Sequence, residues 1–186
     1  MTDRVHLFDT TLRDGAQTSG VDFTVDDKIR IAGLLDDFGF DYVEGGYPGA
    51  NPTDTEFFET RRTKRARFTA FGMTKRAGVS VSNDPGLAAV LASAADTCCF
   101  VAKAWDYHVR LALGITPEEN LESVRRTVEA ALATGREVLI DCEHFFDGYK
   151  ADPAHALSVA WTAWEAGAPG PGERRRGEDD VAPELG

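Results

Sequence analysis

Residues 7–20, LFDTTLRDGAQTSG, place a short apolar run directly before a dense cluster of polar side chains. A strand that only had to reverse direction would need a turn of about two residues. This stretch instead supplies an arginine, an aspartate and a glutamine within a few positions: Arg13, Asp14 and Gln17. Binding and catalytic side chains of α/β proteins collect at the carboxyl ends of strands. The stretch therefore predicts a strand that ends in a functional site.

The same arrangement of strand and polar cluster recurs along the chain. Apolar or β-branched runs predict five strands, at residues 5–10, 42–46, 68–73, 98–104 and 138–142. Helix-length segments lie between them. Thr24 with Asp27 has the pattern of a capping box, and Thr116 precedes Pro117, which is typical of a first helical position. Because strand and helix alternate without hairpin turns, the strands should be parallel.

Each of these two helices should bury one apolar face. For the helix that starts after Thr24 and ends near Gly39, we expect the buried residues to be Val25, Ile29, Ala32 and Leu35. For the helix that starts after Thr116 and ends near Gly135, we expect Leu121, Val124, Val128 and Leu132.

The polar clusters decide between the two parallel architectures. EGGYPGAN, GMTK, KAWDYH and DCEHFFDGY follow later strands as DTTLRDGAQ follows the first. In a (β/α)8 barrel such clusters converge on one face, whereas an open sheet spreads them along an edge. Eight units need about 250 residues. We therefore expect a partial TIM barrel of about five units, with residues 1–168 as the N-terminal part of a catalytic domain and residues 169–186 as a disordered or non-native tail.

Bulk properties exclude several functions. A net charge of −11 disfavours nucleic acid as a partner, and no apolar run reaches the roughly 18 residues that a membrane span needs. The first residues lack the features of a secretion signal, so we expect a cytoplasmic protein. Three cysteines, an odd number, lie in apolar runs, which predicts reduced and buried thiols: Cys98, Cys99 and Cys142.

Five long motifs then carry a resemblance: DTTLRDGAQ, YVEGGYPGANPTDTEFF, FTAFGMTKRAGVSVSND, KAWDYHVRLALGITPEEN and DCEHFFDGYKAD. From residue 5 to about residue 168 the chain resembles the pyruvate carboxyltransferase-type barrels that include 2-isopropylmalate, homocitrate and citramalate synthases, above all the citramalate branch. The resemblance implies an acyltransferase that condenses acetyl-CoA with pyruvate in isoleucine biosynthesis. It also implies a divalent metal, Mg²⁺ or Mn²⁺, and a homodimer in the full-length form.

The resemblance implies roles for six residues. Asp14 would bind the metal, for which a carboxylate oxygen is well suited. Arg13 would polarise the 2-oxo group, and Gln17 would contact the 2-oxo acid. Glu44 and His108 would bind substrate, and Glu143 would act in catalysis. The residues alone leave simpler alternatives open: a solvated turn pair for Arg13 and Asp14, a strand end for Glu44, and a packing or surface role for His108.

One family feature is absent from the sequence. The barrels that the chain resembles complete their metal site with a histidine pair spaced H-x-H, and the four histidines of this chain, at positions 6, 108, 144 and 155, are not so spaced. We therefore expect a truncated or frameshifted and inactive piece of a longer synthase. The alternatives are a 2-isopropylmalate synthase, a lyase or carboxyltransferase on the same barrel, and a catalytically dead interaction or regulatory protein.

Overall fold

The structure, a computed structural model, describes residues 5–168. In this range five parallel strands form one sheet in chain order: β1 (Phe8–Asp9), β2 (Tyr42–Gly46), β3 (Arg67–Met73), β4 (Thr97–Lys103) and β5 (Glu137–Glu143). The five expected strands are therefore present. The first is much shorter than residues 5–10, because the chain turns tightly from Thr10 onward. The tail expected at residues 169–186 lies outside the described range.

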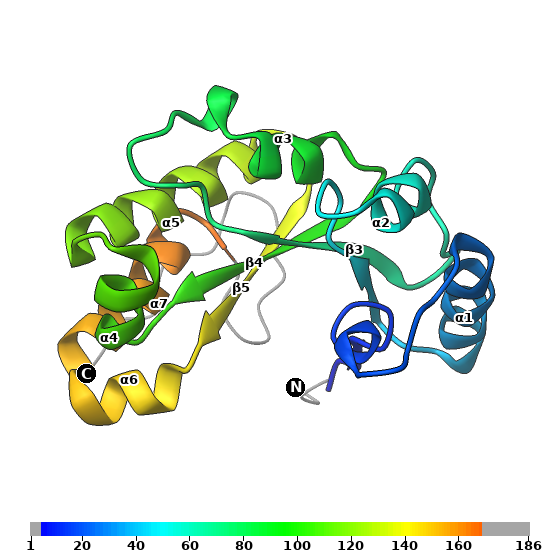
Figure 1. The fold of residues 1–186 in the computed structure, drawn as a ribbon, viewed down its shortest axis with the longest axis horizontal. Coiled ribbons are helices and arrows are strands. Elements are labelled where there is room, and N and C mark those ends of the chain that lie inside the picture. Colours follow the sequence, from blue (N-terminus) through cyan, green and yellow to red (C-terminus); the bar gives the residue numbers. More distant parts are fainter. Residues whose placement is uncertain (1–4, 169–186) are drawn as a thin grey trace, which may run out of the picture.

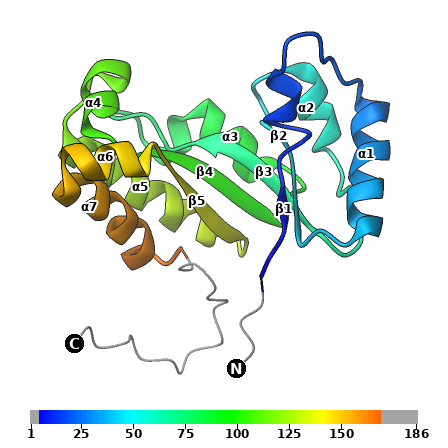
Figure 2. The same cartoon turned by 90° about the horizontal axis from the view of Figure 1, so that it is seen from below.

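One set of helices covers one side of the sheet, and a second set of elements follows the strand ends. The covering helices are α1 (Val25–Phe38), α2 (Pro52–Phe57), α3 (Pro85–Ala92), α5 (Pro117–Leu132) and α7 (Pro153–Glu165). They arch around the outside of the strands in Figure 1. The elements that follow the strand ends are η1 (Gly15–Gln17), η2 (Val81–Asn83), α4 (Asp106–His108), η3 (Val109–Leu113) and α6 (Phe145–Ala151). Figure 2 shows the sheet from below, with β1 and β5 as its edges. The architecture is a half-barrel, as expected for part of a TIM barrel.

The predicted helix starts are confirmed. The Thr24 side chain accepts a hydrogen bond from the Asp27 backbone N–H, and the Asp27 carboxylate accepts one from the Thr24 N–H. Thr116 and Glu119 form the same capping box at α5, with Pro117 in the first helical turn. Each box satisfies backbone donors that a helix start would otherwise leave without partners. α1 ends as predicted at Gly39, whose positive φ of 101° suits glycine.

The buried face of α1 differs from the prediction. Ala32 is buried, but Val25, Ile29 and Leu35 are only partly buried, and the charged residues Lys28 and Asp36 lie in the interior. Asp36 accepts hydrogen bonds from three consecutive backbone N–H groups at residues 64–66, at 2.9, 2.9 and 2.6 Å. Buried charges are tolerated when they are fully paired in this way. The predicted apolar residues pack against the core, and the same face of α1 also carries two charged residues whose partners are distant in the sequence.

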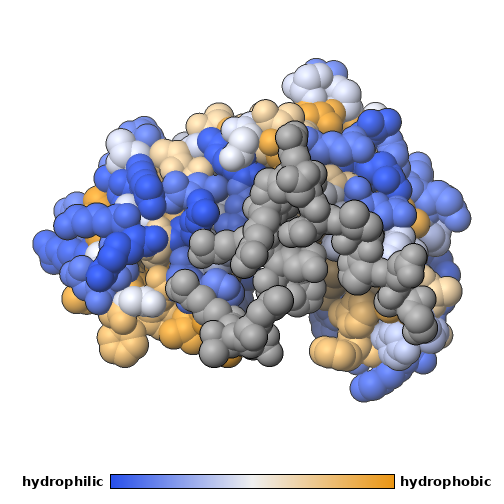
Figure 3. All heavy atoms as spheres, turned by 180° about the vertical axis from the view of Figure 1, so that it is seen from behind, coloured by the Kyte–Doolittle hydropathy of each residue, from blue (hydrophilic) through white to orange (hydrophobic). Residues whose placement is uncertain are grey.

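Most of the core lies between the sheet and the helices. Phe57, Phe58 and Phe68 are fully or almost fully buried there, with Phe58 stacked on Phe68 at a centroid distance of 4.4 Å. All three cysteines are free thiols; Cys98 and Cys99 are buried and Cys142 is partly buried. Seen from behind, the visible surface is mostly hydrophilic, with smaller separate hydrophobic patches (Figure 3). Among residues 5–168, no helix is both long and apolar enough to cross a membrane.

Candidate active site

The inner face of the half-barrel is the face away from the core. Side chains alternate along a strand, so core residues such as Val43 and Cys98 face the helices, and their neighbours Glu44 and Cys99 face inward. On β5 the same alternation sends Asp141 and Glu143 inward. Carboxylates and a thiol from three strands thus share the inner surface of the sheet.

The DTTLRDG segment folds into a compact turn at the end of β1. The backbone N–H groups of Arg13, Asp14 and Gly15 all donate to the Thr10 carbonyl, at 3.1, 2.8 and 3.2 Å. The Arg13 side chain folds back over the inner face, where its Nε donates to Glu44 Oε2 at 2.8 Å. Its guanidinium lies over the Phe71 ring, 4.0 Å from the centroid. Arg13 is therefore fixed by an ion pair and a stacking contact.

Glu44 is the buried partner in this pair, with only 1% of its side chain exposed. Burial raises the pKa of Glu44, Arg13 lowers it, and the nearby Asp141 carboxylate raises it, with a net upward shift. The Cys99 thiol also shares a hydrogen bond with the Glu44 carboxylate. Burial, followed by the charges of Glu44 and Asp141, raises the pKa of Cys99. A buried carboxylate of this kind holds the arginine in one orientation.

A cavity of about 380 Å³ lies beside Arg13. Arg13 and Gln17 both line it, together with Tyr47, Asn51 and Phe71. Asp14 lies next to Arg13, whose Nη1 is 3.4 Å from Asp14 Oδ1, and 64% of the Asp14 side chain is exposed. The structure thus places Arg13 and Gln17 at one opening, with Asp14 and Glu44 as the ion-pair partners of Arg13.

Glu143 and His108 occupy the far side of the inner face. Glu143 forms an ion pair with Lys103 of β4. His108 packs against the Trp105 ring at 4.8 Å and edge-on against His144 at 4.7 Å. Within residues 5–168, His108 makes no hydrogen bond or ion pair with Arg13 or Glu44. The aromatic and histidine cluster thus forms a second group of side chains after β4 and β5.

Asp141 is a residue that the sequence reasoning missed. Desolvation raises the pKa of Asp141, Arg13 and Lys103 lower it, and the Glu143 and Asp14 carboxylates raise it, with a net upward shift. The pKa of Asp141 therefore depends on charges near Arg13 and on charges at the ends of β4 and β5. The sequence alone could have identified Asp141 as a site residue, because it precedes Glu143 by two positions and strand alternation puts both side chains on one face.

The metal that the sequence leads us to expect has an incomplete set of donors here. Among the described residues, no group of three or more His, Cys, Asp or Glu side chains could hold a metal ion. Asp14 offers one exposed carboxylate. A bound catalytic metal needs several fixed ligands around an open position. The donor set of residues 5–168 therefore does not fit a complete metal site.

The sequence profile of the HMGL-like family matches residues 4–170, most of the chain. The chain belongs to the HMGL-like family. It is 54% identical over 172 residues to an (R)-citramalate synthase of Streptomyces coelicolor and 47% identical over 171 residues to that of Aquifex aeolicus. Each alignment covers 90% of this chain and 32% of the relative. A 2-isopropylmalate synthase of Sulfolobus acidocaldarius is 32% identical over 170 residues, 89% of this chain and 41% of that protein.

Solved structures agree on the fold of this HMGL-like chain. The hydroxymethylglutaryl-CoA lyase of Pseudomonas aeruginosa superposes with a TM-score of 0.68 and 24% identity. The superposition covers 89% of this chain and 56% of that structure. This superposition confirms the TIM-barrel fold expected from the sequence. The chain spans about a third of the length of the (R)-citramalate synthases that it matches.

Proposed function

We propose that this HMGL-like chain supplies part of the active site of an acyltransferase that condenses acetyl-CoA with pyruvate to give citramalate. The observation that carries the proposal is the Arg13 guanidinium, held by buried Glu44 at the edge of a cavity that Gln17 also lines. Identity of 54% and 47% to (R)-citramalate synthases, against 36% and 32% to 2-isopropylmalate synthases, supports pyruvate as the 2-oxo acid.

In this proposal Arg13 binds the 2-oxo group of pyruvate. When the acetyl-CoA enolate attacks the carbonyl carbon, a C–C bond forms and negative charge develops on the carbonyl oxygen. A guanidinium held in advance stabilises that charge without reorganising during the reaction. Glu44 keeps the guanidinium aligned, and the Gln17 amide donates to the pyruvate carboxylate. The alkoxide then takes a proton from solvent, and water cleaves the thioester to give the second carboxylate of citramalate and the free CoA thiol.

Forming the enolate requires a base. We assign this role to Glu143, which would take a proton from the acetyl methyl group and which Lys103 holds in place through their ion pair. His108 would contact substrate beside it. Asp14 would give a divalent metal one carboxylate ligand.

Pyruvate binding by the purified 186-residue chain tests the proposal, because binding can be measured whether or not the chain turns over. We expect Arg13→Gln to weaken pyruvate binding by roughly 10-fold or more in isothermal titration, the effect of losing a charged hydrogen bond. Arg110→Gln is the matched control, since Arg110 is exposed and pairs with Asp106. CoA release from acetyl-CoA with added Mg²⁺ or Mn²⁺ then reports catalysis by the chain itself.

The alternative functions predict different binding results. Tighter binding of 2-oxoisovalerate than of pyruvate would favour a 2-isopropylmalate synthase. Absence of binding to either 2-oxo acid, or equal affinity in wild type and Arg13→Gln, would contradict the proposal and favour an interaction or regulatory protein. The homodimer and the cytoplasmic location remain predictions, which analytical ultracentrifugation and cell fractionation would test.

A further inference from the structure

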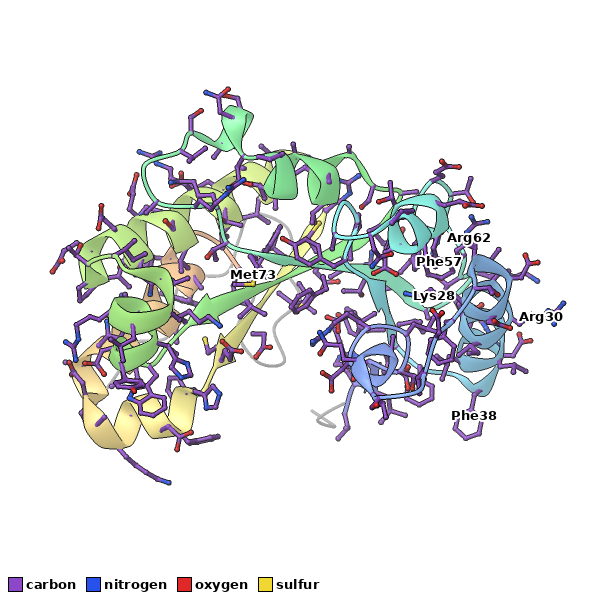
Figure 4. The ribbon with its side chains drawn as sticks, viewed as in Figure 1. Lys28, Arg30, Phe38, Phe57, Arg62 and Met73 are labelled. Atoms are coloured by element: carbon purple, nitrogen blue, oxygen red, sulfur yellow. The ribbon has the colours of Figure 1, made fainter. Side chains whose placement is uncertain are left out.

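Lys28 is a charged residue in the interior, with 3% of its surface exposed. Lysine is almost never fully buried unless it is paired. Its Nζ donates to the Leu12 carbonyl at 2.8 Å, to the Gly45 carbonyl at 2.9 Å, and to the Asp54 carboxylate. Figure 4 shows Lys28 reaching from α1 toward β2 and α2. All three donors of the ammonium group are therefore used within the protein.

The two carbonyl acceptors adjoin the two residues of the buried ion pair. Leu12 directly precedes Arg13, and Gly45 directly follows Glu44. One ammonium group thus joins the turn after β1 to the end of β2, on either side of the 2.8 Å contact between Arg13 Nε and Glu44 Oε2. The relative placement of the two strand ends depends on this link.

Asp54 completes the link from the side of α2. Its second carboxylate oxygen accepts from the Tyr47 backbone N–H at 2.9 Å and from Asn51 Nδ2 at 3.0 Å. Gly46 lies directly against it, with a φ of 144°, and a Cβ at that position would come within 2.6 Å of the Asp54 carboxyl group. The loop after β2 is thus packed around the ion pair of Lys28 and Asp54, and the Asp54 carboxylate neutralises the buried Lys28 charge.

We propose that Lys28 is a positioning residue that sets Arg13 against Glu44 and thereby directs the guanidinium toward the cavity. An apolar side chain of similar length could fill the space. It would leave the Leu12 and Gly45 carbonyls without their donor, and buried acceptors left unsatisfied are costly. Lys28 and Asp54 also line the cavity. Because the Leu12 and Gly45 carbonyls and the Asp54 carboxylate use all three Lys28 donors, Lys28 acts on substrate through Arg13. The part that concerns pyruvate rests on the proposed function.

The test uses the full chain with Lys28→Met and with Lys28→Met/Asp54→Asn, in which no buried carboxylate is left unpaired. Asp36→Asn is the matched control, because Asp36 is also a buried charge on α1 but bonds to residues 64–66. The first measurement is the NMR signal of the Arg13 Nε–H group, assigned by its loss in Arg13→Gln. The second is pyruvate affinity.

In the double variant we expect the Arg13 Nε–H signal to shift and to exchange faster with water, and pyruvate affinity to fall roughly 10-fold. Asp36→Asn should lower stability and leave both readouts unchanged. A folded double variant with the wild-type signal and affinity would overturn the proposal, as would equal effects of Asp36→Asn. If neither Lys28 variant folds, Lys28 is required for folding and a separate positioning role is rejected. If wild type binds no pyruvate, the proposed function fails, while the NMR signal still decides the role of Lys28.

Discussion

Replacing Arg13 by methionine should make the stability of this fold depend more steeply on pH. The change removes the guanidinium that neutralises Glu44, whose side chain is 1% exposed. Breaking a buried ion pair by removing one partner costs about 3–5 kcal/mol. Because 19% of the Arg13 side chain is exposed, we expect the lower end, about 3 kcal/mol at neutral pH.

The sign of the pH dependence follows from Glu44. Burial already raises its pKa in the folded state, and losing the opposing charge of Arg13 would raise it further. A folded-state pKa above the unfolded value means that the folded chain retains a proton that the unfolded chain releases. The folded state therefore becomes less stable as pH rises from the pKa of Glu44 in the unfolded chain to its pKa in the folded chain, and it becomes more stable again on acidification. The deficit of Arg13→Met should be larger near neutral pH than at mildly acidic pH.

Urea unfolding of wild type and Arg13→Met at about pH 5 and about pH 7.5, followed by circular dichroism, measures this difference. Arg13→Met/Glu44→Gln is the control, since an amide at position 44 does not titrate. Its deficit relative to Glu44→Gln should be nearly the same at both pH values. An equal deficit of Arg13→Met at the two pH values, or a pH dependence that persists with glutamine at position 44, would refute the reasoning.

Three further predictions concern the core. Gly45→Ala would place a Cβ 2.6 Å from the Phe57 ring, so we expect a loss of about 1–3 kcal/mol in urea unfolding; wild-type stability would contradict it. Burial acts to raise the pKa of Asp36, but the backbone N–H groups at residues 64–66 outweigh it and lower the pKa. The Asp36 carboxylate therefore stabilises above its unfolded pKa and loses this effect as pH falls through the folded value, so Asp36→Asn should cost about 2 kcal/mol at neutral pH and little in acid. Burial raises the pKa of Cys98 and of Cys142 to about 11, so mass spectrometry should find iodoacetamide labelling slow at about pH 8 and fast in urea.

Local signals in the sequence predicted the fold well. The helix starts at Thr24 and Thr116 and the apolar strand runs each depend on a few neighbouring residues, and the structure has them where they were expected. The polar cluster after the first strand also predicted that Arg13 and Gln17 would lie at one opening. These features could be predicted because their causes are close in the chain.

The contacts that arrange the site could not be predicted in the same way. Lys28 lies on α1 beside apolar residues, and its acceptors are 16, 17 and 26 positions away. Helical periodicity places it near the edge of the apolar face and says nothing of those partners. The same is true of Asp36, whose three donors lie 28 to 30 positions further along. The partners of a buried charge can therefore be identified only once the fold is known.

The order of the sheet has a consequence for how the molecule reaches its native state. Each strand of residues 5–168 pairs only with the strands immediately before and after it in the sequence. Each pairing therefore closes one loop that holds its own helical crossover, and loop closure over such lengths is entropically cheap compared with joining distant segments. This order allows the sheet to grow by one strand and one crossover helix at a time from the N-terminal end, with each new strand pairing with the one before it.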